Sequence, residues 1–142
     1  MTYKLILSPQ QGFTDFKFRN TFNKYFGGID TFYAPYIRLN DNMEMKSSKF
    51  RDVLPENNLV DELVPQVLTN DADEFLLVAK DVQQLGYNEL NWNLGCPSPT
   101  VVKRELGSGL LPHAHKIDDI LNRVYSESDI QVSIKMRLGF DN

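Results

Sequence analysis

The amino-acid sequence predicts an α/β fold, the N-terminal part of a (β/α)8 TIM barrel with about five βα units. Strand-like and helix-like segments alternate along the chain, which favours right-handed βαβ connections and a parallel sheet. The first strand-to-helix turn lacks the Gly-x-Gly-x-x-Gly pattern of a doubly wound, dinucleotide-binding sheet. Polar residues instead follow several different strands, which is how barrel enzymes place their functional residues. These observations favour a barrel over a doubly wound sheet.

The expected elements follow from local periodicity and turn residues. Strands are predicted over residues 3–7, 31–36, 63–68, 90–94 and 132–137. Helices are predicted over residues 16–26, 71–85 and 117–124. Gly27 and Gly28 end the first helix, and Asp71 with Glu74 three residues later begins the second. Residues 38–58 are polar and weakly patterned, so they are predicted to form a long loop with room for a short helix.

Composition limits the class of protein. The chain has 142 residues, of which 42% are hydrophobic and 24% charged, as is typical of a globular domain. A net charge of -4 argues against broad electrostatic binding of nucleic acid but leaves local phosphate contacts open. Cys96 is the single cysteine, so no internal disulfide can form and a reducing, cytoplasmic compartment is predicted. No membrane span is expected, and His113 and His115 lack the further ligands of a metal site.

Two predicted strands alternate polar and apolar side chains. Asn91 and Asn93 share one face of the fourth strand, and Ser133, Lys135 and Arg137 share one face of the fifth. Both faces of a helix-covered parallel sheet are buried, so these polar groups need partners, and a polar ligand at the strand ends would provide them. An antiparallel sheet with one face in water is the alternative, which the alternation alone leaves open.

Four segments carry a more specific pattern. They are Ser8-Pro9-Gln10-Gln11-Gly12-Phe13-Thr14-Asp15 with Phe18-Arg19, Pro65-Gln66-Val67-Leu68, Asn93-Leu94-Gly95-Cys96-Pro97 with Gly107-Ser108-Gly109-Leu110-Leu111, and Val132-Ser133-Ile134-Lys135-Met136-Arg137-Leu138-Gly139. In this order and spacing the chain resembles the tRNA-dihydrouridine synthases, flavoenzymes of the FMN-dependent barrel group. Gln10 and Pro99 depart from the family pattern, because methionine and lysine are usual at those positions.

The resemblance implies reduction of the uracil 5,6 double bond in tRNA, with FMN as cofactor and NADPH as reductant. Cys96 is the implied general acid at C5 of uracil, since a thiol with an unperturbed pKa of ~8.5 is mostly protonated near neutrality. The implied cofactor-binding residues are Ser8, Pro9, Gln10, Gln66 and Lys135. The implied substrate-binding residues are Asn93, Lys103, Arg104 and Arg137.

Several of these assignments have a simpler structural alternative. Lys135 could be a strand-end lysine whose ammonium reaches solvent. Arg137 could form a surface ion pair. Lys103 and Arg104, in the loop after Cys96, could be solvated charges rather than ligands of tRNA phosphates.

The resemblance also predicts the domain organisation. Residues 1–142 are expected to form a partial FMN-binding barrel domain, without the C-terminal half of the barrel and without the family's helical tRNA-binding domain, because a complete barrel takes ~250 residues. Without the phosphate-binding turns of the later strands, this chain alone is expected to bind FMN poorly and to be inactive. Open sheet edges then predict self-association. Two other functions stay open: an FMN-dependent barrel acting on a free pyrimidine, as relatives of dihydroorotate dehydrogenase do, and a non-catalytic half barrel that binds tRNA or a partner protein.

Overall fold

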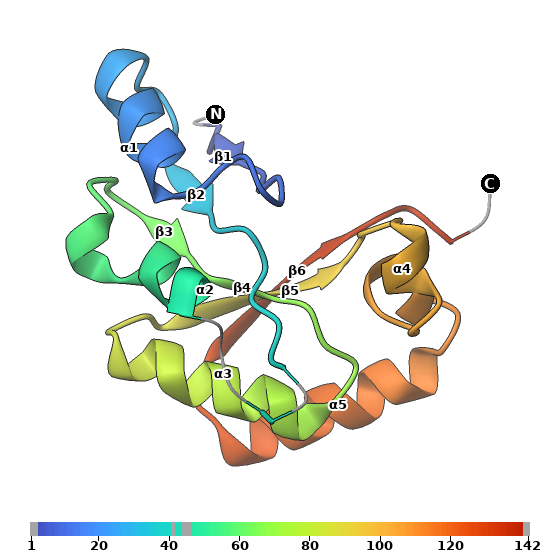
Figure 1. Ribbon diagram of the computed structural model, residues 1–142. Coiled ribbons are helices and arrows are strands. Elements are labelled where there is room, and N and C mark those ends of the chain that lie inside the picture. The colour runs from blue at the N-terminus through green and yellow to red at the C-terminus, as the bar shows by residue number, and fades with distance from the viewer. Residues whose placement is uncertain (1–2, 41, 44–46, 141–142) are drawn as a thin grey trace. The chain divides into compact units, whose positions relative to one another are not determined.

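The structure is a computed structural model that describes residues 3–40, 42–43 and 47–140 (Figure 1). The chain divides into two compact units, Met1–Gln66 and Val67–Asn142. Strands pair in parallel in both units, β1 with β2 and β2 with β3 in the first, and β5 with β6 in the second. The predicted α/β architecture with parallel strands is thereby confirmed.

The first unit contains a parallel sheet of strand order β1-β2-β3. Its elements are β1 (Ile6–Leu7), α1 (Phe16–Tyr25), β2 (Thr31–Tyr33), α2 (Ser47–Val53), the 3-10 helix η1 (Pro55–Asn57) and β3 (Leu63–Val64). The second strand is shorter than predicted, because β2 ends at Tyr33. The long loop predicted over residues 38–58 contains both α2 and η1, so it is more helical than the sequence suggested.

Helix α1 begins and ends where its turn residues predict. The Asp15 side chain accepts a hydrogen bond from the backbone N–H of Phe18 at 3.0 Å, which satisfies one unpaired donor of the first turn. At the other end Gly27 has φ +62, in the left-handed region that glycine adopts without steric cost.

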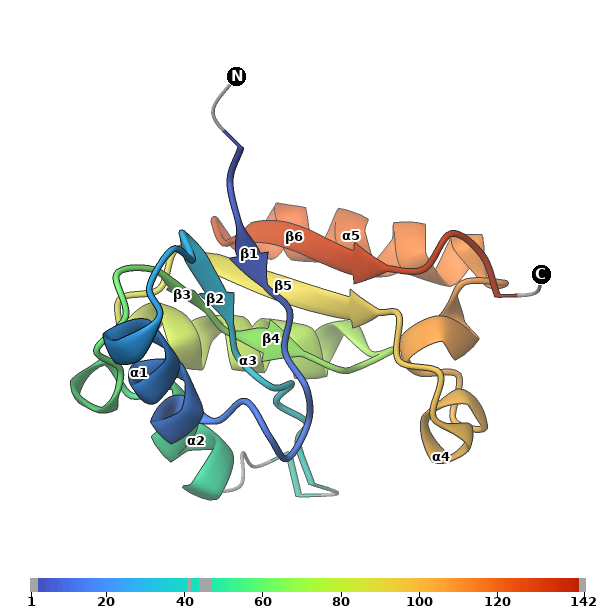
Figure 2. The same cartoon turned by 90° about the horizontal axis from the view of Figure 1, so that it is seen from above.

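The second unit contains a sheet of order β4-β5-β6, whose first strand starts at the last residue of the first unit. Its elements are β4 (Gln66–Val67), α3 (Ala72–Gln84), β5 (Glu89–Leu94), α4 (Pro99–Val102), the 3-10 helix η2 (Gly107–Leu110), α5 (Ala114–Glu127) and β6 (Gln131–Met136). Helices α3 and α5 lie side by side on one face of the β5-β6 pair (Figure 1, Figure 2). The ion pair between Arg123 on α5 and Asp73 on α3 joins the two helices.

One predicted strand is interrupted. Residues 63–68 form β3 and β4 with Pro65 between them, rather than one continuous strand. Proline has no backbone N–H and therefore cannot donate to a strand ladder. The prediction was right about the position of the strand and wrong about its continuity.

The start of α3 uses half of the predicted capping box. Asp71 accepts a hydrogen bond from the backbone N–H of Glu74 at 2.9 Å, as expected. The Glu74 carboxylate does not return to Asp71 but accepts from the Thr69 hydroxyl at 2.6 Å. The Thr69 hydroxyl oxygen in turn accepts from the backbone N–H of Asp71 at 3.0 Å. The Thr69 hydroxyl therefore links the Glu74 side chain to the Asp71 backbone, in place of the direct hydrogen bond of a capping box.

The core of the second unit forms where α3 packs on β5. Trp92 and Phe75 are completely buried, with their rings edge to face and their centroids 5.7 Å apart. The indole N–H of Trp92 donates to the Thr69 carbonyl at 2.9 Å, which satisfies its buried polar atom. The apolar face of β5 is thus anchored, and this leaves the asparagine face for other contacts.

Candidate active site

The polar faces of β5 and β6 meet across the parallel pair. The register places Asn91 opposite Ser133 and Asn93 opposite Lys135, which excludes the antiparallel alternative. The Asn91 side-chain N–H donates to the Ser133 hydroxyl at 2.8 Å, so these two groups satisfy each other. Because parallel strands end at the same edge, Asn93 and Lys135 lie together near the carboxyl end of the pair.

Cys96 follows the carboxyl end of β5, and its peptide groups are held on both sides. Its backbone N–H donates to the Asn93 side-chain oxygen at 3.0 Å, and the N–H of Gly95 donates to the same oxygen at 3.1 Å. The Cys96 carbonyl accepts from the backbone N–H of Ser108 at 3.1 Å and from its hydroxyl at 3.0 Å. No hydrogen bond to the thiol is found among the residues that the structure describes, and Cys96 is half-buried.

Lys135 brings a positive charge next to this turn. A β-carbon at Gly95 would lie 3.6 Å from the Lys135 ammonium nitrogen, so the absence of a side chain at Gly95 leaves space beside the ammonium. Within the described ranges Lys135 has no acidic partner at ion-pair distance. A half-buried cation thus lies at the strand ends, with no carboxylate at ion-pair distance in the part of the chain that the structure describes.

The segment after Cys96 is more ordered than an open loop. Lys103 caps the short helix α4, and Arg104 follows it, with its backbone carbonyl accepting from the Asn70 side chain at 2.9 Å. Both side chains are exposed, as is Arg137 just beyond β6. The structure therefore leaves these three cations exposed, and it places Lys103 and Arg104 in the turn that follows α4, within the predicted loop.

The first unit holds the other predicted cofactor residues. Ser8, Pro9 and Gln10 form the segment between β1 and the turn that begins at Gln10, and Gln66 is completely buried at the start of β4. The Thr14 hydroxyl accepts from the backbone N–H of Gln10 at 2.8 Å, so this turn has a defined backbone.

The same unit contains a buried arginine cluster that sequence reasoning missed. Arg19 is completely buried and donates to the Thr14 carbonyl at 2.8 Å, to the Asp52 carbonyl at 2.6 Å and to the Asn58 side-chain oxygen at 2.8 Å. Asp52 also accepts from the backbone N–H of Phe16 at 2.7 Å. The signal was that Arg19 occurs at helical spacing with Phe16, Phe22 and Phe26, in what is otherwise an apolar stripe of α1. These hydrogen bonds connect α1 to the segment that contains α2 and η1.

Glu105 in the second unit has a pKa that its surroundings shift. The hydrogen bond from the Lys116 ammonium lowers the pKa of Glu105 below its ordinary value, and the charges of Lys116 and His113 act in the same direction. Glu105 is the residue with φ +53 in the turn between α4 and η2, so its ion pair ties this turn to α5.

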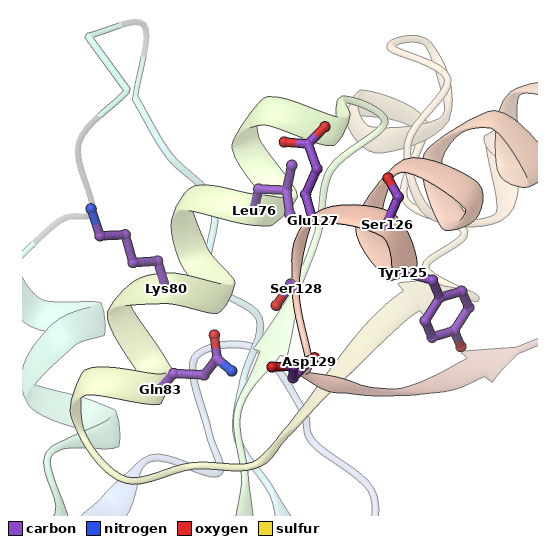
Figure 3. Close-up of a pocket in the computed structure, with 8 residues that line it drawn as sticks. All are labelled: Leu76, Lys80, Gln83, Tyr125, Ser126, Glu127, Ser128 and Asp129. Atoms are coloured by element: carbon purple, nitrogen blue, oxygen red, sulfur yellow. The ribbon is translucent and has the colours of Figure 1, made fainter.

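A cavity of about 520 Å³ lies at the opposite end of this unit (Figure 3). Its lining comes from α3, from the last turn of α5 and from the two residues after α5, and it comprises Leu76, Lys80, Gln83, Tyr125, Ser126, Glu127, Ser128 and Asp129. The end of α5 leads into the amino end of β6, whereas Cys96 follows the carboxyl end of β5. The cavity is therefore separate from the candidate active site.

Two further expectations concern metals and membranes. Among the described residues no three histidine, cysteine, aspartate or glutamate side chains gather in a way that could hold a metal ion. Over the same ranges no helix has both the length and the hydropathy that crossing a bilayer requires.

Comparison with known proteins agrees with the resemblance seen in the sequence. The model of the dihydrouridine synthase (Dus) family matches residues 6–142, and the chain belongs to this family. A tRNA-dihydrouridine(16) synthase of Neisseria meningitidis serogroup B is 29% identical over 146 residues, covering 98% of this chain and 44% of that protein. A tRNA-dihydrouridine synthase B of Pasteurella multocida is 27% identical over 139 residues, covering 97% and 41%. The chain thus spans less than half the length of these two relatives.

Proposed function

We propose that this chain is the N-terminal part of a tRNA-dihydrouridine synthase, an oxidoreductase built on a (β/α)8 barrel that reduces the uracil 5,6 double bond in tRNA with FMN and NADPH. Family membership supports the reaction class. The observation that supports the proposal for this chain is the position of the Lys135 ammonium next to Gly95, the residue before Cys96, at the ends of two parallel strands.

Cys96 is the proposed proton donor. Its peptide is held by Asn93 and Ser108 while its thiol has no hydrogen bond within the described part of the chain, so the thiol is available to a ligand. A group that protonates a reacting carbon must be held within hydrogen-bond reach of it. Bound reduced FMN would provide the hydride chemistry at C6 of the uracil, and the Cys96 thiol would deliver its proton to C5 and become a thiolate.

The side chains of the second unit suit a flavin. A reduced flavin carries negative charge near its N1–C2 edge, and a cation preorganised there stabilises that charge. Lys135 fits this role because it has no acidic partner in the described ranges and because Gly95 leaves space beside its ammonium. Ser8, Pro9, Gln10 and Gln66 are the proposed cofactor contacts from the first unit.

The substrate contacts are proposed for exposed cations and one amide. Lys103, Arg104 and Arg137 are exposed and would neutralise tRNA phosphates. A uracil within folded tRNA has to leave its stack to reach the thiol, as in base-flipping enzymes. Because the side-chain oxygen of Asn93 is engaged by two backbone N–H groups, we assign Asn93 first to holding Cys96, with substrate contact as its second role.

Self-association and a cytoplasmic location stay predictions. The first is supported by apolar side chains exposed on the edge strands, where Ile6 of β1 is 49% exposed and Met136 of β6 is 60% exposed. Light scattering on the protein across a concentration series checks it: a constant monomer mass contradicts self-association.

The proposed function is tested with tRNA that lacks dihydrouridine. The longer protein proposed to contain this chain is expected to form dihydrouridine with FMN and NADPH, detected by mass spectrometry of the digested nucleosides, whereas residues 1–142 alone are expected to be inactive. In the longer protein, Cys96→Ala should bind FMN with unchanged affinity and slow the single-turnover reduction by a factor of about 10²–10⁴, the contribution typical of a general acid. Ser126→Ala, at the far end of α5, serves as the control and should keep wild-type activity.

Three outcomes would contradict the proposal. Equal single-turnover rates for the wild type and Cys96→Ala would remove the acid role. Reduction or oxidation of a free pyrimidine without activity on tRNA would indicate a different FMN-dependent barrel enzyme. Binding of tRNA without any flavin binding would indicate a non-catalytic module.

A further inference from the structure

Ser108 contacts Cys96 although twelve residues separate the two in the sequence. Ser108 lies in η2 and is 1% exposed. Both its backbone N–H and its hydroxyl donate to the carbonyl oxygen of Cys96, at 3.1 and 3.0 Å. A carbonyl oxygen is already satisfied by one good donor, so the hydroxyl adds a second restraint to the same peptide group.

The close approach of η2 to Cys96 depends on a missing side chain. A β-carbon at Gly107 would lie 2.7 Å from the carbonyl oxygen of Cys96 and 2.9 Å from its Cβ. Only glycine therefore lets the neighbouring Ser108 reach the peptide of Cys96 in this geometry. On the other side, the Asn93 side chain accepts the N–H of Cys96 at 3.0 Å.

We propose that Ser108 is a positioning residue for Cys96, whose hydroxyl, together with Asn93 on the other side, fixes the direction in which the Cys96 side chain leaves the backbone. Holding the N–H and the C=O of one residue restricts its φ and ψ, and these set the direction of its Cα–Cβ bond. The thiol then keeps only rotation about χ1, so it stays within reach of one point in space. The link to catalysis rests on the function proposed above, whereas the restraint on the thiol does not.

The rate at which iodoacetamide alkylates Cys96 under native conditions tests this restraint without any flavin or tRNA. Mass spectrometry of the peptide that carries Cys96 gives the rate for this thiol alone. Ser108→Ala removes the hydroxyl and keeps the backbone donor, and it should raise the rate about fivefold, the effect of losing one hydrogen bond of ~1 kcal/mol. Ser108→Thr restores a hydroxyl and should bring the rate back to within about twofold of the wild type.

Ser126→Ala is the matched control. The Ser126 hydroxyl donates to the Arg123 carbonyl at 2.8 Å, which is the same type of hydrogen bond at the far end of α5. This variant should alkylate at the wild-type rate. Its urea midpoint, measured beside that of Ser108→Ala, shows how much of any change comes from global stability alone.

An unchanged or lower alkylation rate in Ser108→Ala would overturn the proposal, and so would an equal rise in Ser126→Ala. If the longer wild-type protein that contains this chain reduces tRNA, Ser108→Ala in that protein should also lower kcat about fivefold while KM stays constant, because the substrate contacts are intact. If the longer protein does not reduce tRNA, the proposed function fails, while the alkylation series still decides whether Ser108 positions the thiol.

Discussion

Gly107 and Cys96 approach so closely that no other residue fits at position 107. Gly107 has φ +56, and a β-carbon on it would lie 2.7 Å from the Cys96 carbonyl oxygen. Backbone conformation and space thus impose the same requirement, and both come from the return of the chain against the end of β5. The Gly107-Ser108-Gly109 segment of η2 therefore packs against the backbone of Cys96, and Ser108 donates two hydrogen bonds to its carbonyl oxygen.

Gly107→Ala should therefore destabilise the second unit. The positive φ costs about 1 kcal/mol and the clash with the Cys96 peptide a further ~1–3 kcal/mol, by analogy with overpacked cores. Gly86→Ala is the control, because Gly86 has φ +93 but no described atom beyond its chain neighbours within 4 Å of an added β-carbon. Urea denaturation of both variants separates the two costs. If both variants lose the same free energy of unfolding, the predicted clash between the new β-carbon at position 107 and the Cys96 peptide contributes nothing measurable, which would contradict this prediction.

In the longer protein, Lys135→Met is expected to weaken flavin binding about tenfold or more, since a hydrogen bond to a charged group contributes ~1.5–3 kcal/mol. The methionine keeps most of the side-chain volume and removes the charge. Flavin fluorescence quenching during titration gives the affinity. Lys80→Met on α3 is the control, because Lys80 is an exposed lysine that lines the separate cavity. An affinity for FMN that is identical in both variants would indicate that the Lys135 ammonium is only solvated and does not contact the flavin.

Arg19→Met should lower the free energy of unfolding by about 3–5 kcal/mol, because it leaves the Asp52 carboxylate buried without its counter-ion. Arg19 is completely buried and Asp52 is 6% exposed. The double variant with Asp52→Asn should lose less than the sum of the single variants, since the two groups share one cluster. Lys17→Met, an exposed position of the same helix, should change stability little. Additive losses in the double variant would contradict the coupling.

The Glu105 ion pair predicts a stability that depends on acid pH. Since the hydrogen bond from Lys116 lowers the pKa of Glu105 below the ordinary 4.5, its contribution is present above that value and is lost as the pH falls through the folded-state pKa. Carboxyl NMR should show Glu105 titrating below 4.5 in the wild type and closer to 4.5 in Lys116→Met. The same titration in Lys80→Met should match the wild type. If the Glu105 titration curve is the same in Lys116→Met as in the wild type, Lys116 is not the cause of the lowered pKa.

Local patterns were sufficient for part of the fold. The Asp71 cap, the glycine stops and the alternating faces of β5 and β6 each depend on residues within a few positions of one another. Short helices were harder to predict. Helix α4 begins with Pro99 at its first position, a recognised start signal, but its four residues carry no periodicity that could distinguish a helix from a loop.

The buried arginine shows a different limit. Arg19 occupies an apolar position of the α1 stripe, and a charged residue there reads as a solvated side chain. Its partners Asp52 and Asn58 lie 33 and 39 residues further on, in a segment whose sequence is weakly patterned. Only the folded chain brings two backbone carbonyls, a carboxamide oxygen and a carboxylate around the guanidinium.

By itself the sequence determined the parallel α/β class, the ends of α1 and α3 to within a residue, the polar face of the two strands and the position of the cysteine after the first of them. It placed α5 correctly but made it three residues too short at each end. These properties follow from periodicity and turn chemistry, which act over a few residues. The tertiary structure decided what holds Cys96, because the contact with Ser108 requires the chain to return after α4 and Gly107 to admit it. Such an approach depends on distances between remote backbone atoms, which no local pattern of side chains encodes.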